Sequence, residues 1–289
     1  MSSPRSVILL RSHADPALTR RRIAAWHAAN PRSAIVFYDG TGGAMEIGDD
    51  PALNLVRYPH PRLHGYGCSI VFDAFRWIAE RFPGAHCHYT EYDSVPLRAG
   101  YLDTLALPAD VVLAGESDLE STDFRAWYEE YRVRAVEVVG RVWNVPVILS
   151  YGFGPTLILG AECVRYLGGF DEEDFERHLQ PALERLGRSS PLWDGKGFFS
   201  FDEVITMSLL AGRGFRRVFN PHARHLVFGE CTEDAYWEAR AAGAFAVHAF
   251  KRALPWEADA VHVEGAGLRA LRRLVEAESE TVAAAGVGG

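Results

Sequence analysis

The chain has 289 residues, of which 48% are hydrophobic and 24% charged, an ordinary composition for a globular protein with a sizeable core. Its formal net charge of −8 and the scatter of its basic residues argue against a nucleic-acid surface. The tightest basic run, Arg20–Arg22, falls on a predicted helix, where an exposed face is expected to carry it.

Signals for secretion or membrane insertion are not seen in the sequence. The first apolar run, Val7–Leu10, is too short for a signal peptide or a membrane span. The four cysteines are too far apart to form a C-x-x-C pair. We therefore expect a cytoplasmic protein without a membrane span, with free and mostly buried thiols.

The first forty residues predict a strand, a helix and a second strand. Val7–Leu10 and Ala34–Tyr38 are apolar runs typical of strands that are buried on both faces. Asp15 followed by Pro16 predicts an N-cap with proline at the first helical position, and Asn30 precedes the proline that ends the helix. This βαβ unit predicts a parallel sheet.

The rest of the chain continues the alternation of strands and helices. We therefore expect an α/β protein with a mostly parallel central sheet flanked by helices. The further strands are expected at Leu53–Tyr58, His86–Glu91, Asp110–Gly115, Val147–Leu149, Thr156–Leu159 and Phe215–Phe219. The further helices are expected at Ser69–Phe82, Asp123–Val139, from Ala161, and at Ser200–Ala211, Glu233–Ala244 and Gly267–Ala284.

An acidic tip follows the strand at His86–Glu91. If the chain stays extended from Thr90 to Asp93, the side-chain period of two places Glu91 and Asp93 on one face. Two carboxylates at a strand end suit a divalent cation that bridges the phosphates of a nucleotide. Ordinary loop carboxylates have the same sequence pattern.

Polar residues follow three of the predicted strands. They are Arg11–His13, Asp39 and Glu91–Asp93. Ligands of open parallel sheets bind at the carboxyl ends of the strands, so these residues are expected to converge on one crevice. Neither glycine-rich phosphate loop, G-x-x-x-x-G-K-[ST] or G-x-G-x-x-G, is present where it is needed, which leaves a cation on Asp93 to neutralise phosphates.

Four stretches together resemble a known family. They are Glu91–Ser94, which is similar to a D-x-D motif; Ile158–Asp171, which ends in G-G-F-D; the acidic helix start Phe201–Thr206; and Val247–Lys251, with a late histidine. In this order they resemble the nucleotide-sugar-dependent glycosyltransferases of the A-type fold, over about residues 5–251. The first motif position departs from that pattern, because it is Glu91 and not aspartate.

The resemblance implies the architecture and the substrates. It implies a Rossmann-like, nucleotide-diphospho-sugar transferase domain over residues 1–289, with a nucleotide-binding half (about 1–145), an acceptor-side half (about 146–265) and a C-terminal helix and tail (about 266–289). The donor is then a nucleoside-diphosphate sugar, the acceptor carries a hydroxyl group, and Mn²⁺ or Mg²⁺ is the cofactor.

The resemblance also implies roles for individual residues. The metal is expected on Asp93, Glu91 and His248, and the nucleotide near Arg11, Ser12, His13, Asp39 and Asp73. If the reaction inverts configuration, Asp202 or Glu203 acts as the base. Ser200 and Glu203 have the spacing of a capping box, which leaves Asp202 freer for that role.

Two other functions are compatible with this sequence pattern. A sugar-phosphate nucleotidyltransferase uses a similar sheet but typically has a glycine-rich, lysine-containing loop after the first strand, which Arg11–Asp15 lacks. A glycosyltransferase-like protein that binds a nucleotide sugar without turnover is consistent with the degenerate motif at Glu91. The sequence leaves the sugar, the acceptor, the stereochemistry and the oligomeric state open.

Overall fold

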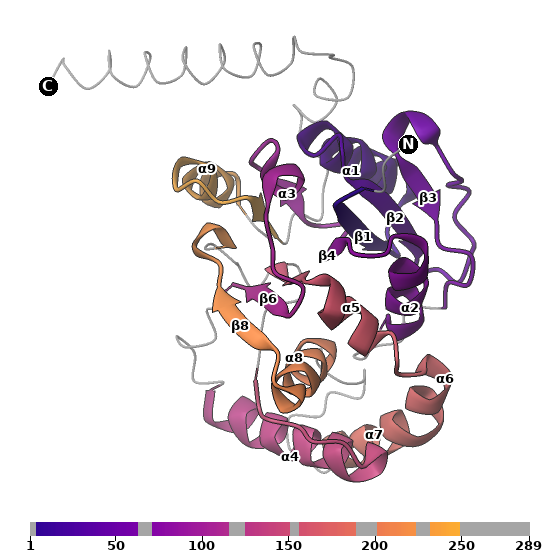
Figure 1. Ribbon diagram of the computed structural model, residues 1–289, viewed down its shortest axis with the longest axis vertical. Helices are drawn as coiled ribbons and strands as arrows, with labels where there is room; N and C mark the ends of the chain where they lie inside the picture. The colour runs from indigo at the N-terminus through magenta and orange to yellow at the C-terminus, as the bar shows by residue number, and fades with distance from the viewer. Residues whose placement is uncertain are drawn as a thin grey trace, which may run out of the picture.

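The structure, a computed structural model, describes residues 4–62, 71–115, 125–150, 156–188, 201–223 and 232–248 (Figure 1). For residues 125–132, 187 and 201–203 it describes the backbone only. The predicted helix at Gly267–Ala284 and two of the cysteines, Cys68 and Cys231, lie outside the described residues.

A seven-stranded sheet forms the centre of the protein, in the order β3-β2-β1-β4-β7-β6-β8. β7 is antiparallel to both of its neighbours, and the other pairs are parallel. The expected α/β class with a mostly parallel sheet is therefore confirmed. The strands are β1 (Ser6–Ser12), β2 (Ala34–Asp39), β3 (Leu55–Arg57), β4 (His86–Glu91), β6 (Val111–Ala114), β7 (Ile158–Leu159) and β8 (Arg216–Phe219).

The N-terminal βαβ unit forms as predicted. Helix α1 (Pro16–Ala29) connects β1 to β2, and Asp15 caps it by accepting hydrogen bonds from the backbone of Ala17 and Leu18. Asn30 ends the helix. Every residue of β1 and β2 is buried, because helices cover both faces of the sheet.

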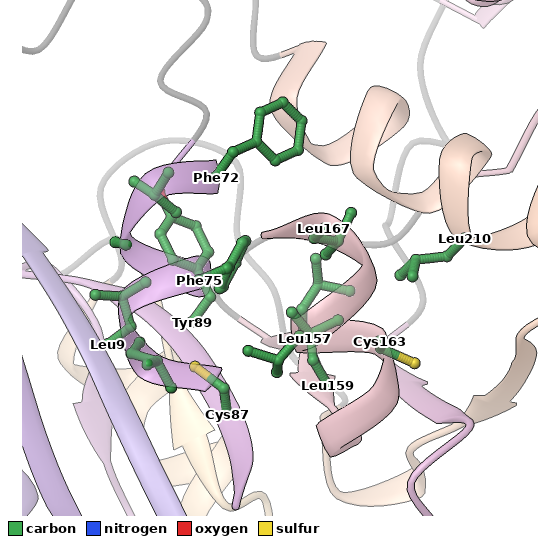
Figure 2. Packing of buried hydrophobic residues seen from close by; sticks show 14 of the residues in the cluster. Leu9, Phe72, Phe75, Cys87, Tyr89, Leu157, Leu159, Cys163, Leu167 and Leu210 are labelled. Carbon is green, nitrogen blue, oxygen red and sulfur yellow. The ribbon is translucent and has the colours of Figure 1, made fainter. Parts of the chain in front are cut away.

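Two apolar clusters lie on the two faces of the sheet. The larger one packs α2 (Phe72–Arg81), α5 (Ala161–Leu167) and parts of α4 (Arg125–Trp143), α7 (Gln180–Arg188) and α8 (Phe201–Arg213) against β4 and β7. Figure 2 shows its centre, where Phe75 and Tyr89 lie opposite Leu157, Leu159 and Leu167. Cys87 and Cys163, both buried in this cluster, are free thiols, as expected.

The second cluster packs α1 and α3 (Tyr101–Thr104) against the opposite face. Besides 3-10 turns at Pro51–Leu53 and Pro221–Ala223 and a π-helix at Phe175–Leu179, the described fold has four further elements. They are β5 (Val95–Pro96), α6 (Glu172–Asp174), α9 (Glu233–Ala241) and β9 (Ala246–Val247). Within the described residues no helix is long and apolar enough to cross a membrane.

One predicted strand is wrong. Val147–Leu149 runs beside α8 and not in the sheet, and Ile148 is 59% exposed. Ile148 donates its backbone N–H to the carbonyl of Ser208, and the Ser208 hydroxyl bonds to the backbone of Ser150. These hydrogen bonds to α8 take the place of the strand-to-strand hydrogen bonds that an apolar run alone predicts.

Candidate metal centre

Three polar strand ends lie side by side at one edge of the sheet. β1 pairs in parallel with β2 and with β4, in a register that places Ser12 opposite Asp39 and Arg11 opposite Glu91. The convergence that the strand order predicts is thus present in the backbone. This edge is the carboxyl edge, where ligands of such sheets bind.

The acidic tip reaches its position through a turn. β4 ends at Glu91, and the N–H of Ser94 donates back to the carbonyl of Glu91 at 3.0 Å. The N–H of Tyr92 donates to the carbonyl of Arg11 at 2.9 Å. The condition of an extended chain from Thr90 to Asp93 is therefore not met, and a turn brings the two carboxylates together instead.

A small antiparallel ladder brings His248 to this turn. β5 pairs with β9 in the register Val95 to Val247, so the residue after Val247 lies next to the residues before Val95. His248 Nε2 is 3.2 Å from Asp93 Oδ1. One ligand atom from each of Glu91, Asp93 and His248 lies within 4.8 Å of the other two. Residues predicted as metal ligands from distant parts of the sequence are thus close neighbours.

The chemistry of these three side chains fits a divalent cation. Two carboxylate oxygens suit Mn²⁺ or Mg²⁺, and the imidazole nitrogen is a ligand of transition metals, which include Mn²⁺. Adjacent ligands of an octahedral ion lie about 3 Å apart, close to the separation of Asp93 and His248. The Glu91 side chain is 26% exposed and that of Asp93 6%, so the group is open to solvent on the Glu91 side.

Two side chains support Glu91. The guanidinium of Arg11, which is buried, lies 4.0 Å from the Glu91 carboxylate and donates to the hydroxyl of Tyr89 at 3.3 Å. That hydroxyl donates to Glu91 at 3.3 Å. Tyr89 was missed in the sequence analysis, although the period of two along β4 places it on the same face as Glu91.

Arg22 was also missed, and its predicted exposure is wrong. Its side chain is completely buried, and Nε donates to the carbonyl of Tyr92 at 2.8 Å. Burial lowers the pKa of Arg22 to about 10, against the opposing effect of Asp93, so the guanidinium stays charged at neutral pH. One signal in the sequence indicates this burial. Arg22 lies four residues from both Leu18 and Trp26, so it shares their face of helix α1.

The residues predicted to bind the nucleotide fall into two groups. Asp39 and Ser12 are fully buried and occupied locally: Asp39 accepts hydrogen bonds from Thr41, Met45 and Arg57, and Ser12 bonds to Thr19. These local hydrogen bonds indicate that Asp39 and Ser12 stabilise the chain at the edge of the sheet.

His13 and Asp73 are more accessible. His13 is exposed and lies edge-on to Tyr92, with ring centroids 5.1 Å apart. Asp73, in the first turn of α2, forms an ion pair with Arg76 at 3.3 Å and donates its N–H to Glu172 at 3.1 Å. Burial, followed by the charge of Asp73, raises the pKa of Glu172 to about 8.

The two candidate bases lie at the start of α8. The helix begins at Phe201, so Asp202 and Glu203 are in its first turn, as predicted. Their side chains, and Ser200 of the expected capping box, lie outside the described residues. Their assignment stays a prediction.

Comparisons with known proteins give structural likenesses only. No protein-family model and no curated protein matches the chain. The chain is similar to a galactosyltransferase, LgtC, in complex with donor and acceptor sugar analogues, with 12% identity, 86% of this chain and 89% of that chain covered, and a TM-score of 0.45. It is also similar to the apo form of the glycosyltransferase GlyE of Streptococcus pneumoniae, with 10% identity and a TM-score of 0.45. That match covers 95% of this chain and 64% of GlyE, just under two thirds of its length.

Proposed function

We propose that this protein is a metal-dependent glycosyltransferase that moves a sugar from a nucleoside-diphosphate sugar to an acceptor hydroxyl. The observation that carries the proposal is the group Glu91, Asp93 and His248, whose ligand atoms lie within 4.8 Å of one another beside the carboxyl ends of parallel strands. The order of the four sequence motifs supports the same reaction.

Each residue near the sheet edge has a role in this proposal. Asp93, Glu91 and His248 hold Mn²⁺ or Mg²⁺, and the bound ion supplies the positive charge that stabilises the departing diphosphate. Arg11, acting through Tyr89, orients Glu91. His13 is the exposed side chain beside the cluster, and we assign it to the nucleotide.

The acceptor side of the proposal concerns α8. Asp202 or Glu203 deprotonates the acceptor hydroxyl if the reaction inverts configuration. An acid in the first turn of a helix is also favoured by the helix dipole alone, so its role needs a kinetic test. Release of nucleoside diphosphate is measured in Asp202→Asn and Glu203→Gln. Wild-type rates in both variants would remove the base from the mechanism.

A thermal-shift panel tests the proposed donor and metal. Nucleoside diphosphates and nucleotide sugars are added with and without Mn²⁺. A ligand at a hundred times its Kd stabilises the folded state by about 2.7 kcal/mol, which raises the Tm by about 5 °C or more. We expect that rise only with both nucleotide and metal present.

Matched variants connect the response to the site. Asp93→Asn removes the charge with almost no change in shape, and we expect it to abolish the shift. Asp234→Asn makes the same change at an exposed position on α9 and is expected to respond like wild type. No response of the wild-type protein to any nucleotide with metal would overturn the proposal. Binding without sugar transfer to any acceptor would leave a nucleotide-sugar-binding protein.

A further inference from the structure

A fully buried arginine reaches the metal cluster from helix α1. Arg22 is on the same helix as Ile23 and Trp26 of the apolar cluster on the α1 face of the sheet, and its side chain has no exposed area. Burying a charge in such a place costs several kcal/mol unless it is paired and hydrogen-bonded. An aliphatic side chain would fill the same space at a lower cost, so the charge itself needs an explanation.

The surroundings of Arg22 point to the acidic turn. Nε donates to the carbonyl of Tyr92 at 2.8 Å, and this carbonyl belongs to the peptide that joins Tyr92 to Asp93. Three titratable groups act on the guanidinium: Asp93 and Tyr236 of α9 favour its charged form, and Arg21 opposes it. Arg22 thus bonds directly to the backbone that carries Asp93.

The two carboxylates are supported from opposite faces of the sheet. Glu91 is held by Tyr89, whose ring belongs to the apolar cluster on the α2 face, while Asp93 follows a peptide held from α1. We propose that Arg22 is a positioning residue for the metal site. It holds the Tyr92–Asp93 turn in the conformation that brings Asp93 to 3.2 Å from His248. This inference rests on the proposed function, because it assumes that the cluster binds a cation.

Two physical effects of Arg22 on metal affinity have opposite signs. Its positive charge repels a cation, so removing a residue that acted only through charge would tighten metal binding. Loss of a group that orients a metal ligand weakens metal binding, typically by about 10- to 100-fold. The direction of the change therefore separates positioning from charge balance.

A Mn²⁺ titration, read by the EPR signal of the free ion, makes this measurement. Arg22→Gln removes the charge and the Nε donor, and we expect Mn²⁺ to bind at least about tenfold more weakly. Arg21→Gln makes the same change at the preceding, exposed residue. That charge is screened by solvent, so the control is expected to stay within about twofold of wild type. Circular dichroism and Tm show that each variant is folded.

The outcomes are distinct. Unchanged or tighter Mn²⁺ binding by folded Arg22→Gln overturns the positioning role. If that variant does not fold, Arg22→Lys, which keeps the charge but not the planar guanidinium, is titrated in its place. Weaker Mn²⁺ binding by Arg22→Lys supports the positioning role, and wild-type Mn²⁺ affinity overturns that role. A wild-type protein that does not bind Mn²⁺ would instead remove the proposed function, and this result is separable because it needs no variant.

Discussion

Two histidines of β4 are buried. His86 and His88 point to the α1 face of the sheet, and His88 bonds through Nδ1 to the carbonyl of Leu157 at 3.1 Å. The rings of Trp26 and Phe245 lie about 5 Å from the His88 ring. Burial lowers the pKa of both histidines to about 4, so both are neutral in the folded protein near pH 7.

We predict an acid-labile fold from these two residues. The unfolded chain binds their protons near pH 6.5, whereas the folded chain binds them near pH 4. The free energy of unfolding should therefore fall as the pH drops from 6.5 to 4, by on the order of 3 kcal/mol per histidine. Urea denaturation at several pH values measures it. His88→Gln should flatten the slope, whereas the exposed His178→Gln should not. Equal slopes in all three proteins would contradict the prediction.

The G-G-F-D segment, which begins where α5 ends, packs against α2 in the larger cluster. Gly168 lies against α2, where a Cβ atom would be 2.6 Å from the Cα of Arg76. The Arg76 guanidinium bonds to the carbonyls of Gly168 and Phe170 at 2.8 and 2.6 Å. Phe170 stacks on Trp143, and Asp171 caps α6. The motif therefore has a packing explanation that is independent of any reaction.

Gly168→Ala should weaken the contact between α5 and α2. The added methyl group meets backbone atoms of α2, which cannot move aside as a flexible side chain can. We expect a loss of about 1–3 kcal/mol in the free energy of unfolding, measured by chemical denaturation. Gly48→Ala is the control, because a Cβ at Gly48 has nothing within 4 Å. A variant at Gly168 as stable as the control would show that α5 shifts away at no cost.

The proposed metal cluster joins distant parts of the chain. Glu91 ends β4, Asp93 follows it, and His248 follows β9 at the end of the described residues. The β5–β9 ladder, the bonds from the N–H groups of Leu97 and Arg98 to the carbonyl of Phe245, and the contact between Asp93 and His248 connect them. A bound cation would add a further connection across the same junction.

Mn²⁺ should therefore protect the segment around β9 from hydrogen exchange. A ligand that binds only the closed junction lowers the population of the locally open state by the factor 1 + [L]/Kd, and so slows exchange. We expect exchange in a peptide covering residues 244–248 to slow several-fold or more at saturating Mn²⁺. Asp93→Asn should show no such change. Exchange that is equal with and without Mn²⁺ in wild type would place the ion elsewhere.

The α/β class, the N-terminal βαβ unit and the identity of the acidic strand end could be predicted from the sequence alone. They depend on local signals: buried apolar runs, the Asp15 cap before Pro16, and polar residues where strands stop. Such signals act over a few residues, so they are visible without knowing what packs against them. The prediction of a strand at Val147–Leu149 was wrong because local signals do not show its partner, which is Ser208 of a distant helix.

Only the tertiary structure decided how the site is assembled. The turn at Tyr92–Asp93, the approach of His248 and the burial of Arg22 depend on contacts between residues far apart in sequence. The sequence identified Glu91 and Asp93 as a pair at the end of a strand, but only the structure shows that a turn, and not an extended chain, brings them together. It also assigned Arg22 to solvent, since a charged residue is exposed by default unless a buried partner is known. That partner, the carbonyl of Tyr92, exists only once α1 has packed against the sheet.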